Sequence, residues 1–579
     1  MPDTAKNNSG IEKERQLILE AKQKGTLATL GAFVKLSGPG WLQSAITLGG
    51  GSLASSLYLG VLAGLSLLWL QPLAMILGVI MLSAISYVTL STGERPFQAI
   101  NKHVNPVLGW GWAIATLMAN LVWALPQFSL GTAAVRQNIM PEILGADAIA
   151  NNTGNLIVCC CIAAVCITVV WFYDKGKKGI KLFEILLKIM VGIVVICFFG
   201  VVVKMSLKGI LNWSEVWGGL IPDWRLLSVP VKTFTPHVEA VAEPFRDFWR
   251  SLIVSQQRDV MISAVATAVG INMTFLLPYS MLKRGWNKDF RGLAIFDLST
   301  GLYIPFVLAT GCVVIASATQ FHAHPAKGFL GEKDDSGAII VPDKNLAGSY
   351  YKLAEARIRF ELGPDEIKKQ LGGLTEPEKS RRLNTLIENL PEADKKMAAM
   401  LVKRDAFNLA KSLSPLTGDV VANYTFGIGV LGMAISTIII LMLINGFVVC
   451  EMLGLKSQGW PYRLGCLAPC VGMLGPFFWK KAAFWLAVPT SVFGMALLPI
   501  AYFTFFFVMN QKKLLGDNIP KGGKRILWNI LMLLAASLAA FGSIWSVWSK
   551  AGSKGLGIIV GFILLAIVVH FIRKGKTPD

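Results

Sequence analysis

The stretch ITLGGGSLASS, Ile46–Ser56, decides the fold. Three consecutive glycines, Gly49–Gly51, lie in a segment apolar enough to cross a lipid bilayer. Each glycine weakens a helix by about 1 kcal/mol relative to alanine, so the run predicts an interruption inside a membrane span. An interrupted helix in lipid leaves backbone N–H and C=O groups without partners, and is tolerated only where protein, water or a solute satisfies them.

Composition and hydropathy predict an integral membrane protein. The chain is 54% hydrophobic and 16% charged, and its apolar runs repeatedly reach about 20 residues, the length that crosses a bilayer. These runs predict an all-α fold with about twelve transmembrane helices. The predicted spans are 31–64 (broken at the glycines), 66–92, 107–133, 155–173, 180–203, 259–282, 295–318, 424–452, 463–479, 483–509, 526–548 and 555–572.

The net charge of +20 indicates orientation and not a nucleic-acid partner. Much of the excess lies in short loops beside the spans, and basic loops mark the cytoplasmic side. We therefore expect a multi-pass protein of the plasma (inner) membrane, with the lipid bilayer as its surroundings and both termini cytoplasmic. The basic clusters are Lys175, Lys177, Lys178 and Lys181; Lys283, Arg284, Lys288 and Arg291; Lys512, Lys513, Lys521, Lys524 and Arg525; and Arg573, Lys574 and Lys576.

Four parts follow one another along the chain. Residues 1–30 are polar and read as a cytoplasmic N-terminal tail, without the pattern of a signal peptide. Residues 31–320 form a first transmembrane part with seven spans, and residues 424–579 a second part with the remaining spans. Between them, residues 321–423 carry apolar positions at helical spacing separated by Gly and Pro, which predicts a helical insertion on the outer face.

A second interruption is expected in AVGINMTFLLPYS, Ala268–Ser280. Paired broken helices at corresponding positions of two halves indicate a transporter built from inverted repeats, with its substrate site at the breaks. The alternative is that the glycines only let helices pack closely. The predicted substrate-binding residues are Gly49, Gly50, Gly51, Ser52, Asn272, Met273 and Thr274.

Ionisable groups inside membrane spans are rare and usually functional. In this chain they are Glu184, Lys188, Asp297 and Glu451. The spans hold no clustered Ser/His/Asp, Cys/His or carboxylate set, so we expect no enzyme activity, no cofactor and no resident metal.

Several segments resemble the NRAMP family of proton-coupled divalent-metal transporters, which have the LeuT-type fold. The likeness covers most spans and spares the outer insertion. It implies a 5+5 inverted repeat followed by two C-terminal helices. The segments are GPGWLQSAITLGGGS (Gly38–Ser52), LSLLWLQPLAMILGV from Leu65, VGINMTFLLPYSMLKR (Val269–Arg284), INGFVVCEMLG (Ile444–Gly454) and VFGMALLPIAYFTFFFVMNQKKLLGD (Val492–Asp517).

The resemblance also implies where the family's metal ligands would fall. Its Asp-Pro-Gly-Asn break corresponds to Gly49–Ser52, and its Met-Pro-His break to Asn272–Thr274. Its tenth-span glutamine corresponds to Val492, and the acidic pair of its third span to Leu125 and Phe128. Each of the family's carboxylates and its imidazole is thereby replaced.

We therefore expect an NRAMP-like secondary transporter that works by alternating access. Metal-ion transport is what the family implies, while the site residues favour a substrate other than a classical transition metal. One alternative is a carrier of a small neutral or zwitterionic solute or of a monovalent ion. Another is a non-transporting membrane receptor or scaffold. The sequence leaves the coupling ion and the oligomeric state open.

Overall fold

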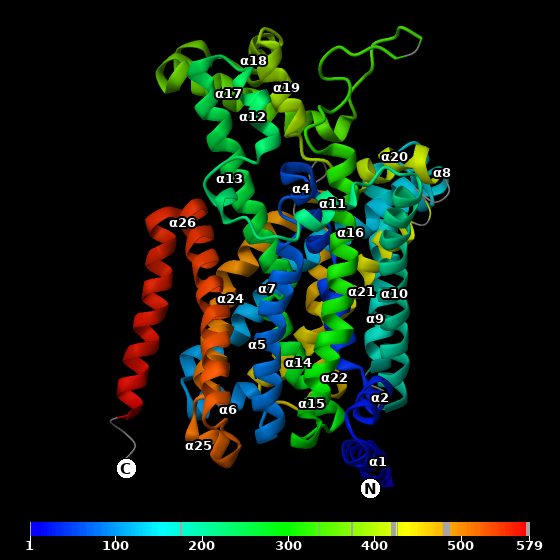
Figure 1. Cartoon of the computed structure of the whole chain (residues 1–579), viewed down its shortest axis with the longest axis vertical. Coiled ribbons are helices and arrows are strands. Elements are labelled where there is room, and N and C mark those ends of the chain that lie inside the picture. The colour runs from blue at the N-terminus through cyan, green and yellow to red at the C-terminus, as the bar shows by residue number, and fades with distance from the viewer. Residues whose placement is uncertain are drawn as a thin grey trace.

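The computed structural model describes residues 2–173, 177–334, 336–371, 374–418, 424, 426–478 and 487–574 of the 579-residue chain. Within these ranges the secondary structure is helical, apart from one isolated bridge between Lys333 and Ile339. Long helices stand side by side in a bundle, and a smaller group of helices lies beyond one end of it (Figure 1). The predicted all-α class is confirmed.

Most helices of the bundle have the length of a membrane span. Nine described helices are long and apolar enough to cross a membrane, or ten if the bent pair α3 and α4 counts as one span. The bundle helices are α3 (Pro39–Thr47), α4 (Gly50–Ala63), α5 (Leu70–Thr92), α7 (Pro106–Ala134), α9 (Asn151–Tyr173), α10 (Lys177–Leu207), α13 (Glu243–Ala268), α14 (Ile271–Arg284), α15 (Arg291–Leu298), α16 (Ile304–Phe321), α21 (Phe426–Met452), α24 (Ala487–Met509) and α26 (Gly523–Lys574).

The count differs from the predicted twelve in two places. The predicted span 463–479 consists of α22 (Gly459–Leu467), a 3-10 segment and α23 (Gly475–Phe478), because Pro469 and Pro476 cannot supply the N–H bonds of one continuous helix. The predicted spans 526–548 and 555–572 are the two arms of α26. This helix turns back on itself at Gly552, whose φ of 55° suits glycine (Figure 1).

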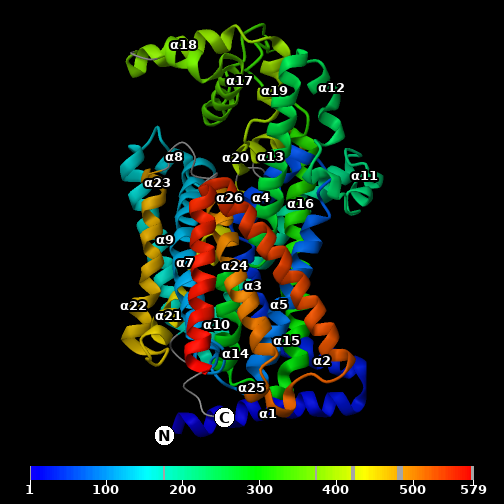
Figure 2. The same ribbon diagram turned by 90° about the vertical axis from the view of Figure 1, so that its left-hand side faces the viewer.

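The N-terminal segment is more ordered than a tail. Residues 1–30 were expected to be a polar tail, but α1 (Pro2–Lys24) and the start of α2 (Thr26–Leu36) occupy them. Helix α1 lies across the end of the bundle (Figure 2), where Ile18 is buried and Arg15 Nε lies 2.6 Å from Asp289 Oδ2. The first span consequently begins at Pro39 and not at residue 31, because α2 ends before Ser37.

The described residues of the segment predicted to be an insertion form helices, and these share their packing with the bundle. The segment contains α17 (Lys344–Leu371), α18 (Glu376–Glu388), α19 (Glu392–Met400) and α20 (Ala406–Thr417), and lies with α12 (Thr235–Glu239) at the end opposite α1 (Figures 1 and 2). We call α17–α20 the cap. The 26 residues of α13 extend about 39 Å, so its first turns rise out of the bundle and pack against the cap.

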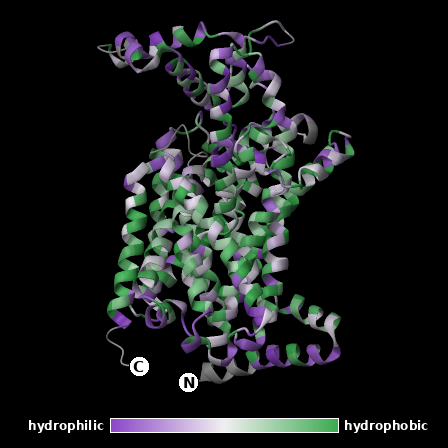
Figure 3. Cartoon of the chain, turned by 60° about the vertical axis from the view of Figure 1, so that its left-hand side comes forward, coloured by the Kyte–Doolittle hydropathy of each residue, from purple (hydrophilic) through white to green (hydrophobic). Residues whose placement is uncertain are grey.

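Burial separates the lipid-facing helices from the central ones. Hydrophobic residues dominate the length of the bundle and polar residues its two ends (Figure 3). In the most apolar 18-residue window of each span, 6% is buried inside the protein for α26, against 89% for the pair α13 and α14. The interrupted helices therefore lie in the core of the bundle, shielded from lipid by their neighbours.

Candidate functional site

The first span is interrupted next to the glycine run. Helix α3 ends at Thr47 and α4 begins at Gly50, with a bend of 56° between them. The non-helical residues are Leu48 and Gly49, so the break is shorter than the predicted Gly49–Ser52. Gly50, Gly51 and Ser52 form the first turn of α4, which the bond from Leu53 N to Gly49 O closes at 3.1 Å.

The second interruption lies at Val269 and Gly270, between α13 and α14. Asn272, Met273 and Thr274 form the first turn of α14, and Asn272 Oδ1 accepts a 2.9 Å hydrogen bond from Met273 N. Pro278 lies within α14 without ending it. Apart from Gly49, which lies in the first break, the predicted residues thus follow a break directly, each group at the N-terminus of a helix.

The two interruptions meet. Thr47 Oγ1, at the end of α3, lies 3.2 Å from Met273 Sδ and 3.5 Å from Ala268 O. Ser52 Oγ donates a hydrogen bond to Thr47 O across the first break. The ends of both broken helices are therefore in contact, and all the predicted site residues are buried.

Three further helices line the breaks with polar groups that the sequence analysis missed. Gln127 Oε1 of α7 accepts a 2.9 Å hydrogen bond from Gly50 N. A Cβ at Gly49 would lie 2.5 Å from Thr437 Oγ1 of α21, and one at Gly51 would lie 3.3 Å from Ser491 Oγ of α24. The glycines therefore also allow close packing between helices. A break in the helix and close packing are both present at this position. The sequence feature that could have indicated these lining residues is a polar side chain inside an apolar span.

Asn272 leaves a hydrogen-bonding group unused. Its side chain is 2% exposed, and Nδ2 has no partner among the described residues. Thr274 Oγ1, by contrast, accepts from Trp112 Nε1 at 2.9 Å and donates to Ile271 O at 2.5 Å. A buried amide donor without a partner is costly, and a polar solute bound at the break would satisfy it.

The chemistry around the breaks is neutral. Within the described ranges, no group of three or more His, Cys, Asp or Glu side chains is arranged to hold a metal ion. The side chains at the breaks offer hydroxyls, amides and the Met273 thioether, and the backbone offers carbonyls and N–H groups. None of these groups carries a formal charge.

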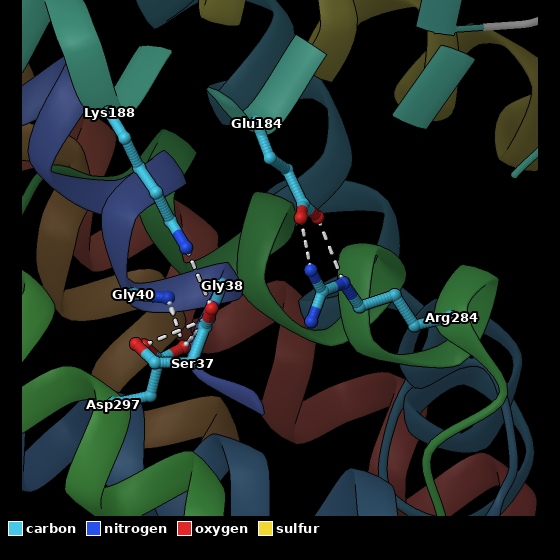
Figure 4. Close-up of polar contacts among 7 residues, drawn as sticks. All are labelled: Ser37, Gly38, Gly40, Glu184, Lys188, Arg284 and Asp297. Carbon is cyan, nitrogen blue, oxygen red and sulfur yellow. Dashed lines mark hydrogen bonds and ion pairs between the residues drawn. The ribbon is translucent and has the colours of Figure 1, made fainter. Parts of the chain in front are cut away.

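The ionisable residues singled out in the sequence lie away from the breaks, in two groups. Figure 4 shows the first, around the N-terminus of α3. There the Asp297 carboxylate accepts hydrogen bonds from Ser37 Oγ, from Gly38 N at 3.1 Å and from Gly40 N at 2.6 Å. A carboxylate at a helix N-terminus is stabilised by the free N–H groups and the helix dipole. Asp297 therefore fixes the N-terminal end of α3, the first half of the broken span.

Two more interactions secure the same region. Lys188 Nζ donates to Ser37 O at 2.8 Å, and Glu184 forms an ion pair with Arg284 at the end of α14 (Figure 4). Glu451 lies elsewhere and pairs with Arg95 at 3.0 Å. The network in Figure 4 thus ties one half of each broken span, α3 and α14, to α10 and α15.

Two interrupted helices that meet in the core of an all-helical membrane bundle define a transporter fold. The sequence model described as natural resistance-associated macrophage protein-like, or Nramp, matches residues 40–335 and 395–549. The chain therefore belongs to the Nramp family. The family expected from the sequence is thereby confirmed, and family and fold together support a secondary transporter of the metal-ion type.

Solved structures share this fold. A histidine-to-alanine mutant of the Eremococcus coleocola manganese transporter is 13% identical, with a TM-score of 0.59, covering 95% of this chain and 96% of that one. The same transporter in complex with an aromatic bis-isothiourea compound is 13% identical, with a TM-score of 0.58 and coverage of 93% and 94%. At this identity the likeness establishes the fold alone. A search of curated protein sequences returned no match.

Proposed function

We propose that the chain moves its cargo by alternating access around the breaks at Leu48–Gly49 and Val269–Gly270. We further propose that this cargo is a monovalent ion or a small neutral or zwitterionic solute, and not a transition metal. The observation that carries the proposal is the neutral lining of two breaks that meet in the core. Beside them lies Asn272 Nδ2, which has no partner among the described residues.

Coordination chemistry supports the second part. A divalent cation loses a tightly held hydration shell on entering a buried site, and carboxylate, imidazole or thiolate ligands normally offset that cost. At these breaks the sulfur of Met273 is the softest ligand, and the Thr47 hydroxyl already donates to it. Hydroxyls, amides and backbone carbonyls suffice for an alkali cation or a polar molecule, whose dehydration costs less.

The directions of the helices support a polar solute. The N-termini of α4 and α14 begin at the breaks and carry partial positive charge, which favours a carboxylate or another acceptor. Helices α3 and α13 end at the breaks, and the free carbonyls at their C-termini favour an ammonium group or an alkali cation. A zwitterion would use both ends.

The network around Asp297 supports alternating access. It anchors α3, the inner half of the first broken span, to α15 and α10. Opening the site towards the cytoplasm would require these bonds to break while α4 stays in place. The 56° bend separates the two halves, so they can move as independent rods.

Divalent-metal transport is the second candidate. Family membership favours it, and the structures similar to this chain are those of a manganese transporter. Under this candidate, backbone carbonyls and water would supply the ligands that the side chains lack.

The proposed orientation has both termini in the cytoplasm of a plasma-membrane protein. Helix α1 and the last turns of α26 lie at the same end of the bundle, opposite the cap (Figure 2). In sealed cells an impermeant thiol reagent should label a cysteine at Ser336 and miss one at Lys288. The reverse pattern would overturn the orientation.

Uptake into proteoliposomes tests the function. Divalent metals, alkali cations and amino acids should be screened with the unaltered protein and with Asn272→Leu, which removes the free amide. Two further variants each add one methyl group to a glycine. Gly51→Ala narrows the site, and Gly192→Ala is its control, because a Cβ at Gly192 of α10 meets open space.

We expect one solute class to show saturable uptake that Asn272→Leu and Gly51→Ala each reduce about tenfold, the effect of losing one buried hydrogen bond or forcing a small displacement. Gly192→Ala should transport normally. Uptake that none of these substitutions changes would remove the site from the breaks.

A further inference from the structure

The outer halves of the two broken spans contact each other directly. Ser55 Oγ of α4 lies 2.6 Å from Ser263 Oγ of α13, and Tyr58 OH donates to Gln256 Oε1 at 2.7 Å. Ser55 and Ser263 are both buried. Separation of α4 from α13 is therefore one way to open a route from the outer side to the breaks.

The cap holds α13 through a buried charged pair. Arg357 of α17 and Asp394 of α19 are 0% exposed, and Arg357 Nε donates to Asp394 Oδ1 at 2.9 Å. The same carboxylate oxygen accepts from Trp249 Nε1 of α13 at 2.7 Å. The Arg357 guanidinium also lies 3.3 Å from the centre of the Phe245 ring of α13. Pulling α13 away would leave Arg357 and Asp394 paired with each other, but would take the Trp249 N–H from the Asp394 carboxylate and the Phe245 ring from the Arg357 guanidinium. Losing a buried hydrogen bond to a charged group is unfavourable.

The cap also holds the side of the bundle on which α4 lies. Lys403, between α19 and α20, places Nζ 5.6 Å from the centre of the Tyr58 ring. Arg404 Nη2 donates to His324 O at 2.6 Å, and its guanidinium lies 4.9 Å from the centre of the Phe321 ring of α16. Helix α20 itself packs against α16 and α4. The cap thus spans from α13 to α4 and α16.

Much of this contact between the cap and α13 comes from residues outside the part of the chain that matches the family model. The family match stops at residue 335 and resumes at residue 395, so Arg357 and Asp394 lie outside it, whereas Phe245 and Trp249 lie inside. Two charged side chains of the insertion therefore bind two aromatic side chains of a broken span.

We propose that the cap is a clamp that holds α4 and α13 together and keeps the outer side of the transport site closed. Release of α13 from Asp394 and Arg357 lets the outer halves separate. The proposal rests on the transport function proposed above, because the clamp regulates access to that site.

The rate at which a buried cysteine is labelled tests the clamp without any substrate. Ser263→Cys places the reporter at the contact between α4 and α13, and an impermeant thiol reagent is added to sealed cells. The parent protein, with its native cysteines alone, gives the background. The clamp is weakened by Trp249→Phe, which removes the indole N–H, and separately by Arg357→Met. Arg359→Met is the matched control, because Arg359 lies on the same helix in an exposed pair with Glu355.

We expect Trp249→Phe and Arg357→Met to raise the labelling rate of Ser263→Cys about tenfold, as when one of two states loses a hydrogen bond to a charged group. Arg359→Met should leave it unchanged. If Arg357→Met does not yield monodisperse protein, Trp249→Phe alone decides. A rate equal to that of the control overturns the clamp, whether or not a cargo is found. A raised rate supports the clamp even if the uptake experiment detects no cargo.

Discussion

The carboxylate of Asp297 receives hydrogen bonds from Ser37, Gly38 and Gly40, where the chain enters the first broken span. Asp297→Asn replaces one acceptor oxygen with a donor that faces N–H groups. We expect the free energy of unfolding to fall by about 1–3 kcal/mol, the cost of leaving buried groups unsatisfied. Asp289→Asn is the control, because its pair with Arg15 lies near the surface and contributes less than about 1 kcal/mol. Chemical denaturation in detergent measures both, and equal losses would contradict the role given to Asp297.

At the level of residues, the sequence indicated where the two spans break, but not which side chains other helices bring to the breaks. The glycine run marked the first break because glycine weakens a helix wherever it lies, and Asn272 stood out as an amide in an apolar segment. The sequence did not indicate Gln127, Thr437 or Ser491 as residues near the breaks. The local sequence of a span does not show which of its polar side chains faces another span. Asp297 was recognised as an intramembrane charge, but its partners across the bundle depend on packing between helices far apart in sequence.

At the level of elements, the contacts of the cap predict which part of the insertion is dispensable. Ala326 N donates to Ala399 O at 3.0 Å, so a short linker can join the chain near these residues. Replacing residues 328–396 with a Gly/Ser linker should leave a monodisperse, membrane-inserted protein whose α13 exchanges amide hydrogens faster at its outer end. Replacing 322–420 also removes Arg404 and α20, which pack against α16. We expect that larger replacement to aggregate on size-exclusion chromatography, and equal behaviour of the two would contradict this division.

Helix boundaries followed the sequence where glycine or proline had a local effect. The break before Gly50 and the turn at Gly552 belong to this class. The boundary of the cap did not, because the predicted span 259–282 includes only the later part of α13, and the predicted insertion begins separately at residue 321. In the structure α13 and the cap are instead joined by the hydrogen bond from Trp249 to Asp394. Contacts between distant segments carry no signal in the hydropathy of either one.

At the level of the whole molecule, the chain is an Nramp-family bundle in which the described residues include no group of three or more His, Cys, Asp or Glu side chains placed to hold a metal ion. The broken spans, the network around Asp297 and the proposed clamp are all compatible with alternating access. They do not depend on which solute is carried. In the proposed transport site the chemistry of the cargo depends on the two breaks, where hydroxyls, amides and backbone groups meet.

Mn²⁺ uptake into proteoliposomes tests this central claim most directly. The unaltered protein should give no saturable uptake above that of protein-free liposomes, because the breaks offer no carboxylate or imidazole ligand. Asn272→Asp, which exchanges an amide for a carboxylate of the same shape, should increase Mn²⁺ binding measured by calorimetry. Gly49→Asp suits this purpose less, because its Cβ would lie 2.5 Å from Thr437 Oγ1. Saturable Mn²⁺ uptake by the unaltered protein that Gly51→Ala reduces would contradict the account, because it would establish transition-metal transport through these same breaks.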